Sequence, residues 1–482
     1  MEMEGSARQD ENSAGLFASC WLWLKLLLEK FRTKVCKIAS DTKNLGKDDP
    51  RRVIHSLKVG VALSIVSVFY YYQPLYDNFG VSAMWAVMTV VVVFEYTVGA
   101  TLGKGLNRGL ATLLAGALGV GAHHLASLSG QIGEPILLGF FVFLQATIST
   151  FIRFFPKVKA RYDYGLLIFI LTFSLISVSG FRDDEILEMA HKRLSTIVIG
   201  SSACVVICIL VCPVWAGEDL HNLIALNLDK LGNFLEGFGG EYFNTSLNEG
   251  SKDDNKTFLQ GYKSVLNSKS SEESLANFAR WEPGHGRFKY RHPWKQYLKV
   301  GTLTRQCAYR IEALHGRLNA DLQLQASPEI REQIQEACTK ISLETGKALK
   351  ELATSVKKMT KPSSADAHIS SSKAASKSLR SLLKSGLWEN IDLLEMIPCV
   401  TVASFLLDVV NCTEKIAESV QELASLAHFK TNTLDPNFLP EKSKSKIDCP
   451  QPQHHVVITI STESAPTLPE NGKPRPSIHM GV

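Results

Sequence analysis

The sequence predicts an all-α membrane protein with six transmembrane helices and a cytosolic C-terminal helical domain. The first half is poor in charge, since only six of the 100 residues from Val53 to Ile152 are Asp, Glu, Lys or Arg. A stretch of that composition cannot build a water-exposed surface. From Ala216 onward, apolar residues recur every three or four positions among many charged ones, which predicts amphipathic helices.

The overall composition excludes several other protein classes. Ten cysteines in 482 residues fall well below the roughly 8–10% of disulfide-stapled secreted domains, so we expect reduced thiols. The net charge of +5 is small and the basic residues form no single stripe, so nucleic acid is not an expected partner. The sequence has no nucleotide-binding or catalytic motif, so we expect neither an enzyme nor a cofactor.

Residues 1–50 are expected to form a cytosolic N-terminal segment with an amphipathic helix over 16–38. The stretch from Leu16 to Ile38 interleaves large apolar residues with five basic ones. Such a helix lies on the inner leaflet, with membrane lipid as its partner. A seventh spanning helix is the alternative. A cleaved signal peptide is not expected, because the acidic start lacks a basic leader.

Residues 51–215 are expected to form the transmembrane domain. Six apolar segments approach the roughly 20 residues that a helix needs to cross a bilayer core of about 30 Å. They are Val53–Gln73, Gly80–Tyr96, Gly109–Leu128, Pro135–Ile152, Tyr164–Gly180 and Arg193–Pro213. Lys and Arg occur before the first span and in the second and fourth loops, whereas the first and third loops contain neither. Because short cytosolic loops are enriched in these residues, both termini should be cytosolic.

Residues 216–430 are expected to form the helical domain, and residues 431–482 a disordered tail rich in Pro, Ser and Lys. Two polar stretches, Ser251–Ser274 and Lys361–Ser378, predict flexible linkers. The segment Ile391–His428 contains an uncharged run of twelve residues. That run is too short to cross a bilayer, so the segment is expected to be a buried core helix.

Basic residues in or beside the spans are the main candidates for function. A charge at the bilayer centre costs at least about 2.5–3.5 kcal/mol and therefore tends to face protein or water. Lys58 in the first span, with Lys192 and Arg193 at the start of the sixth, is expected to line a pore that prefers anions. Four further residues form its cytosolic funnel or merely reflect the positive-inside bias: Arg52, Arg153, Lys157 and Arg161. Alternatively, Lys58 reaches the inner interface or pairs with Glu95.

Acidic residues in two loops suggest a second kind of site. Asp77 in the first loop, with Asp184 and Glu188 in the fifth, offers the carboxylate oxygens that multivalent hard cations prefer. The simpler interpretation is a hydrophilic turn, so no metal site is certain.

Four sequence blocks carry a family resemblance. They are Pro50–Gly60, Thr89–Arg108, Trp215–His221 and Arg280–Gly286, the last of which contains Trp281-Glu282-Pro283. In these blocks the chain resembles the plant aluminium-activated malate transporters. The resemblance implies a dimeric channel that passes malate and other anions passively, with six spans and a cytosolic helical domain in each subunit.

The resemblance also implies residue roles. Lys58 and Arg193 match basic pore positions of the family. Three residues match acidic positions proposed for aluminium in some members: Asp77, Asp184 and Glu188. The residues themselves favour a structural role for Trp281-Glu282-Pro283, because Pro283 and the following Gly make a rigid turn and Trp281 suits a core or dimer anchor.

The expected function is a malate efflux channel at the plasma membrane, with the vacuolar membrane as the alternative location. A proton-coupled exporter of aromatic or organic acids is the alternative from another class. It would need a titratable relay in the membrane, for which Glu95 and His55 are the candidates. A membrane-anchored scaffold, the third alternative, leaves Lys58 and Arg193 unexplained.

Overall fold

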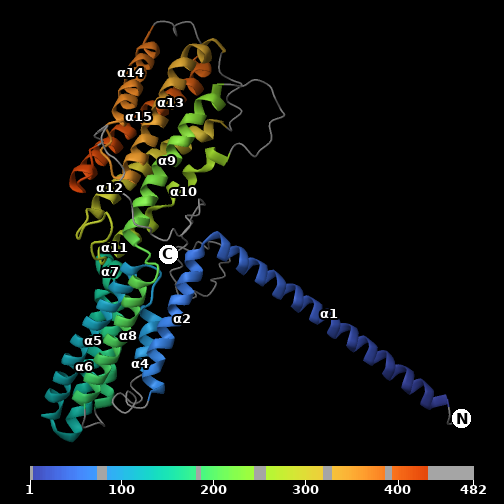
Figure 1. Cartoon of the computed structure of the whole chain (residues 1–482), viewed down its shortest axis with the longest axis vertical. Coiled ribbons are helices and arrows are strands. Elements are labelled where there is room, and N and C mark those ends of the chain that lie inside the picture. The colour runs from blue at the N-terminus through green and yellow to red at the C-terminus, as the bar shows by residue number, and fades with distance from the viewer. Residues whose placement is uncertain are drawn as a thin grey trace, which may run out of the picture.

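The computed structural model describes residues 4–72, 84–180, 186–243, 257–318, 328–385 and 393–431. Over these residues the chain forms fourteen α-helices and one 3-10 helix, with no β-strand, which confirms the predicted all-α class. Figure 1 shows two helical bodies stacked end to end, and one long helix, α1 (Glu4–Asp48), that projects from near their meeting point.

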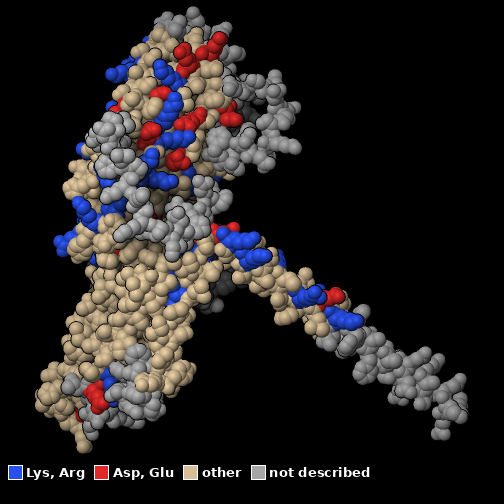
Figure 2. Space-filling view, in the orientation of Figure 1, with Lys and Arg blue, Asp and Glu red and all other residues tan. Residues whose placement is uncertain are grey.

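The first body, which we call the membrane bundle, contains six helices. They are α2 (Pro50–Tyr71), α4 (Met84–Val93), α5 (Val98–Ser127), α6 (Gly130–Ile152), α7 (Pro156–Gly180) and α8 (Ile186–Leu210). Among the described residues, α5 to α8 are long and apolar enough to cross a membrane. Figure 2 shows that the visible surface of this body carries few charges, as a lipid-facing surface requires.

The second body is the helical domain. Its helices are α9 (Ala216–Phe243), η3 (Thr257–Gln260), α10 (Tyr262–Leu266), α11 (Lys269–Ala279), α12 (Trp294–Leu318), α13 (Pro328–Lys358), α14 (Ala365–Leu383) and α15 (Leu393–Leu426). Helices α9 and α13 pack along each other, and α12, α14 and α15 complete the layer. Fully buried side chains such as Leu220, Leu231, Leu349 and Leu406 form its hydrophobic core. Charges of both signs cover its surface in Figure 2.

Helix α15 also has the length and hydropathy of a membrane span over Glu395–Leu426. Its apolar side chains, including Val402 and Val409, are nevertheless buried against α12, α13 and α14. This placement agrees with the predicted core helix.

The prediction of two flexible linkers is wrong over the described residues of both segments, because these residues form helices. The first contains η3, α10 and part of α11, and the second lies mostly in α14. In α14, one face that includes Ala365, Ile369 and Leu379 joins the core. Much of that face is Ala or Ser, so its hydrophobic period is too weak to reveal the helix.

The boundary between the second and third spans also differs from the prediction. The third span begins at Val98, eleven residues before the predicted Gly109. Thr97 caps this helix, since its hydroxyl accepts the backbone N–H three residues on at 3.3 Å. Lys104 and Arg108, which the prediction assigned to a loop, therefore lie inside α5.

One end of the membrane bundle meets the helical domain and is called the proximal end, and the opposite end is called the distal end. The start of α2 and the turns that follow α4, α6 and α8 lie at the proximal end (Figure 1). This alternation is the one that the positions of Lys and Arg predict.

Candidate functional site

Arg193 lies inside the membrane bundle and has no acidic partner among the described residues. Its side chain belongs to α8 and is 5% exposed. The guanidinium lies over the Trp85 ring, 3.9 Å from the centroid, in a cation–π contact. Its Nε has no hydrogen-bond partner, and no carboxylate of the described residues lies within ion-pair distance. A buried cation in this state retains its capacity to bind an anion.

Arg108 is a second buried cation, and the sequence analysis did not place it in the pore. It belongs to α5, is 6% exposed, and donates from Nη1 to the Tyr164 hydroxyl at 3.0 Å. Its Nε also lacks a partner, and it forms no ion pair within the described chain. The guanidinium groups of Arg108 and Arg193 are close enough to interact electrostatically.

The two arginines follow one another along the bundle. Helices α5 and α8 run antiparallel and contact each other closely at Gly105, where a Cβ would lie 3.4 Å from the Ser201 Cβ. Arg108 lies three residues beyond Gly105 toward the distal end, and Arg193 lies eight residues beyond Ser201 in the same direction. At 1.5 Å per residue, the Arg193 backbone is roughly 7 Å nearer the distal end than that of Arg108.

Three buried hydroxyls on α5, α7 and α8 also lack a hydrogen-bond partner. Within the described part of the chain, no partner is present for Thr112 Oγ1 on α5, Ser177 Oγ on α7 or Ser201 Oγ on α8. Buried polar groups are normally hydrogen-bonded, so a set of unpaired ones indicates contact with water or a ligand.

Nearer the proximal end, Lys104 continues the series of basic residues. It forms an ion pair with Glu95, and its Nζ lies 5.6 Å from the centroid of the Tyr164 ring. Tyr164 therefore contacts Lys104 through its ring and Arg108 through its hydroxyl. Lys104, Arg108 and Arg193 form what we call the basic series, which runs from the proximal end toward the middle of the bundle.

Lys58 does not lie beside Arg193. Its Nζ donates to the carbonyl oxygen of Cys212 at 2.8 Å, just beyond the proximal end of α8, and its side chain is 2% exposed. Arg193 is 17 residues before the end of α8, a distance of about 25 Å along the helix. The alternative pairing of Lys58 with Glu95 is also wrong, because Glu95 binds Lys104.

Most of the other predicted basic residues are at least partly exposed and hold an acidic partner. The pairs are Lys192 with Glu188 at 2.6 Å, Arg52 with Asp49 at 3.3 Å and Arg153 with Asp163 at 2.7 Å. Lys157 is exposed. Of the acidic candidates, Glu188 lies near the distal start of α8, whereas Asp77 and Asp184 lie outside the described residues.

Trp281 packs between the helical domain and the proximal end of the membrane bundle. It packs on Gly103 of α5, where a Cβ would lie 2.9 Å from the indole ring. The Arg161 guanidinium of α7 lies 5.2 Å from a Trp281 ring centroid. Nearby, Asn277 Nδ2 donates to the Ala160 carbonyl at 3.2 Å. Helix α11 and the turn after it therefore sit on the ends of α5 and α7.

Glu282 joins three segments at the same junction. Its buried carboxylate accepts hydrogen bonds from the backbone N–H groups of Ala216, at 2.6 Å, and Gly217, at 3.0 Å, at the start of α9. A Cβ on Gly99, at the start of α5, would lie 2.9 Å from Glu282 Cγ. Burial raises the pKa of this carboxyl to about 7, although the hydrogen bonds act in the opposite direction. Pro283 is exposed, so the motif acts at the junction mainly through Trp281 and Glu282.

Comparison with known sequences assigns the chain to a family. A sequence model described as "Aluminium activated malate transporter" matches residues 43–388. The chain belongs to this family. Aluminum-activated malate transporter 2 of Arabidopsis thaliana is 60% identical over 414 residues, covering 86% of this chain and 81% of the relative. Aluminum-activated malate transporter 1 of Triticum aestivum is 45% identical over 462 residues, covering 94% of this chain and 99% of the relative.

The part that matches the family contains the whole membrane bundle and the junction with the helical domain. Aluminum-activated malate transporter 7 of Arabidopsis thaliana is also similar, with 57% identity over 441 residues that cover 86% of this chain and 87% of the relative. The family is one of membrane transporters, and the apolar helices of this member fit a multi-pass membrane protein.

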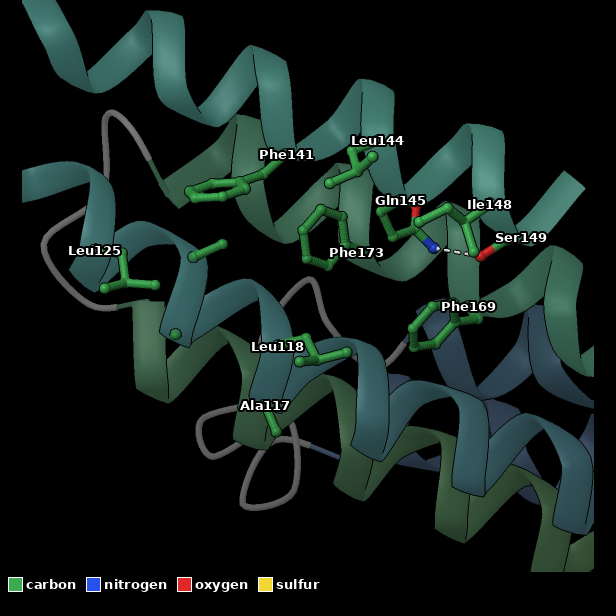
Figure 3. Close-up of a pocket in the computed structure, with 12 residues that line it drawn as sticks. Ala117, Leu118, Leu125, Phe141, Leu144, Gln145, Ile148, Ser149, Phe169 and Phe173 are labelled. Carbon is green, nitrogen blue, oxygen red and sulfur yellow. Dashed lines mark hydrogen bonds between the residues drawn. The ribbon is translucent and has the colours of Figure 1, made fainter.

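A separate cavity of about 440 Å³ lies between α5, α6 and α7 in this family member. Figure 3 shows that Phe141, Phe169 and Phe173 line it, together with the hydrogen-bonded pair Gln145 and Ser149. None of the described residues that line it is charged. The cavity therefore suits an apolar group and is distinct from the basic series.

Proposed function

We propose that this protein is an anion channel that passes malate and related anions passively, as a homodimer that releases malate across the plasma membrane. The observation that carries the proposal is the pair of buried guanidinium groups, Arg108 and Arg193, which have no carboxylate partner among the described residues. The proximal end, where the helical domain lies, is taken to face the cytosol.

The electrostatics of the basic series favour anions. A cation that approached Arg193 or Arg108 would meet like charge in a low-dielectric surrounding, whereas an anion would relieve the repulsion between the two guanidinium groups. Guanidinium also matches the planar geometry of a carboxylate, with two parallel hydrogen bonds. A dicarboxylate such as malate has one such group for each arginine.

The spacing of the series favours passage over permanent binding. Arg108 and Arg193 lie at successive depths, so an anion that leaves one guanidinium group approaches the next, whereas Lys104 is already paired with Glu95. Conduction requires binding that is strong enough for entry and spread over several sites so that the ion can leave. The relatives are named as malate transporters, and this supports malate as the substrate here.

Regulation by aluminium would involve Asp77, Asp184 and Glu188, as the family resemblance implies. Glu188 pairs with Lys192 at 2.6 Å. A trivalent cation would therefore have to compete with that lysine, and this part of the proposal depends on the two residues outside the described chain.

The proposal is tested by two-electrode voltage clamp on cells that express the full chain and are loaded with malate. Wild type should give a current whose reversal potential follows the malate gradient. Arg193→Gln and Arg108→Gln should each reduce it at least about tenfold, because losing about 1.4 kcal/mol of anion stabilisation changes an equilibrium tenfold. Arg153→Gln, which removes an arginine already paired with Asp163, is the matched control and should keep most of the current.

Two outcomes would contradict the proposal. Full current in both Arg193→Gln and Arg108→Gln would exclude the basic series as the path. Malate transport that follows the proton gradient, with a reversal potential that shifts with pH, would favour the coupled exporter, whose candidate relay residues Glu95 and His55 both lie near the proximal end.

A further inference from the structure

Helix α1 presents a large apolar surface that the other described parts of the chain do not cover. Figure 1 shows it projecting away from both bodies. Between Trp23 and Asp48 its large apolar side chains are open to solvent: Trp23, Leu26, Leu27, Leu28, Phe31, Val35, Ile38 and Leu45 are each at least 43% exposed. An exposed surface of this size marks an interaction site.

The apolar side chains gather on one face of the helix. At 100° per residue, Leu27, Phe31, Val35, Ile38 and Leu45 fall within a sector of about 80°. The opposite side carries mainly polar residues such as Thr33 and Ser40, although Leu26 and Lys47 also lie there. The stripe extends over five helical turns, which suits an extended partner surface.

Basic residues border this face on both edges. The helical period puts Lys30, Lys34 and Lys37 along one edge and Lys25, Arg32 and Lys43 along the other. From Trp23 to Asp48 there are seven Lys or Arg against three Asp or Glu. Long basic side chains on both edges of an apolar face can place their charged ends in a layer of polar groups while their methylene groups lie along an apolar surface.

The connection to α2 fixes where this face can act. Asp49 alone separates α1 from α2 and has an extended backbone, with φ −143° and ψ 91°. The last turn of α1 is therefore held at the proximal end of the membrane bundle, where the apolar helices of the bundle end.

We propose that α1 lies along the membrane surface on the proximal side and binds anionic lipid, with Leu27, Phe31, Ile38 and Leu45 facing the acyl chains. The apolar face matches the hydrocarbon boundary and the two basic edges match a layer of negative headgroups. This inference concerns membrane attachment and does not depend on the proposed conduction.

The test is hydrogen–deuterium exchange of the full chain in nanodiscs of phosphatidylcholine alone or mixed with phosphatidylserine. Amides of α1 should exchange at least about tenfold more slowly in the anionic discs, because several basic residues each gain from the surface potential. Phe31→Glu with Ile38→Glu should abolish this protection. Ser40→Glu with Thr33→Glu, on the opposite face, is the matched control and should retain most of it.

A second variant separates charge from apolar burial. Replacing Lys30, Lys34 and Lys37 by Gln should remove the difference between the two lipids and leave any protection by phosphatidylcholine intact. Equal exchange of wild-type α1 in both lipids would overturn the proposal. So would efficient disulfide cross-linking of Ile38→Cys between the two copies in a disc, because the apolar face would then pair with a second α1.

Discussion

Two buried arginines, Arg193 in the membrane bundle and Arg305 in the helical domain, show how differently the two bodies treat charge. Arg305 is 9% exposed and forms an ion pair with the fully buried Glu272. Glu272 also accepts hydrogen bonds from Ser268 Oγ at 2.7 Å and Asn227 Nδ2 at 3.3 Å. Arg193 is 5% exposed and faces an aromatic ring instead. The helical domain compensates the charge of Arg305 internally, whereas no carboxylate among the described residues compensates that of Arg193.

The contrast separates a structural charge from a functional one. Desolvating an unpaired cation lowers stability, so we propose that an anionic ligand, which supplies the missing charge, explains its retention within an apolar bundle. A paired, hydrogen-bonded charge in a soluble core needs no such ligand. Burial alone does not distinguish the two arginines, since both are almost fully enclosed.

Removal of each arginine should change stability in opposite directions, and this is the largest effect that we predict. Arg305→Gln leaves the Glu272 carboxylate buried without its cation and should lower the free energy of unfolding by about 3–5 kcal/mol. Arg193→Gln removes a buried charge that has no acidic partner in the described part of the chain, so the thermal midpoint should stay unchanged or rise. Thermal unfolding of the detergent-solubilised full chain measures both.

Arg310→Gln is the control for loss of an arginine in general. Arg310 forms an exposed pair with Asp408 at 3.6 Å, so its removal should cost less than about 1 kcal/mol. If Arg193→Gln destabilised the chain as much as Arg305→Gln, Arg193 would also have a structural partner and the contrast would fail.

Glu282 lies between the two bodies and should give the stability of the chain a pH dependence. Burial raises its pKa from 4.5 to about 7, so the folded chain holds this proton more tightly than the unfolded chain. The stability that the group contributes is complete below pH 4.5 and is lost as pH rises through about 7. The difference corresponds to about 3 kcal/mol once the carboxyl is fully ionised.

The thermal midpoint of wild type should accordingly fall between pH values of about 5.5 and 8, and Glu282→Gln should flatten the fall. Glu422→Gln removes an exposed carboxylate that binds Lys299 at 2.7 Å and should leave the fall in place. An unchanged slope in Glu282→Gln would assign the pH dependence to other groups and leave the junction without a titrating element.

Hydropathy and the positions of Lys and Arg were sufficient to predict the all-α class and which loops share one end of the bundle, because both depend on composition. The same reasoning failed at Arg108, because a charge near Lys104 and Gly105 is typical of a loop. The helix begins at Val98 with Thr97 as its cap, and it therefore includes Arg108. Pairing between distant residues has no sequence period. The contacts of Lys58 with Cys212 and of Glu282 with α9 therefore required the three-dimensional arrangement.

Lys58 provides the finest test of the comparison, because it is buried and basic like Arg193 but has an acceptor within the chain. Its ammonium donates a hydrogen bond to the Cys212 carbonyl just beyond the C-terminal end of α8. A cation at this end of a helix also interacts favourably with the helix dipole. Cys212 has φ +39°, a conformation that few side chains adopt without support.

We therefore expect Lys58→Met, which keeps the length and apolar stem of the side chain, to destabilise the chain by about 1–2 kcal/mol through loss of one charge-assisted hydrogen bond. Because Arg193 lies about 25 Å away along α8, malate current should fall less than in Arg193→Gln. Voltage clamp of both variants at matched surface expression measures the difference. If the current in Lys58→Met falls as far as in Arg193→Gln, Lys58 lines the path, as the family resemblance implies. An internal hydrogen bond would then not be enough to identify a buried cation as structural.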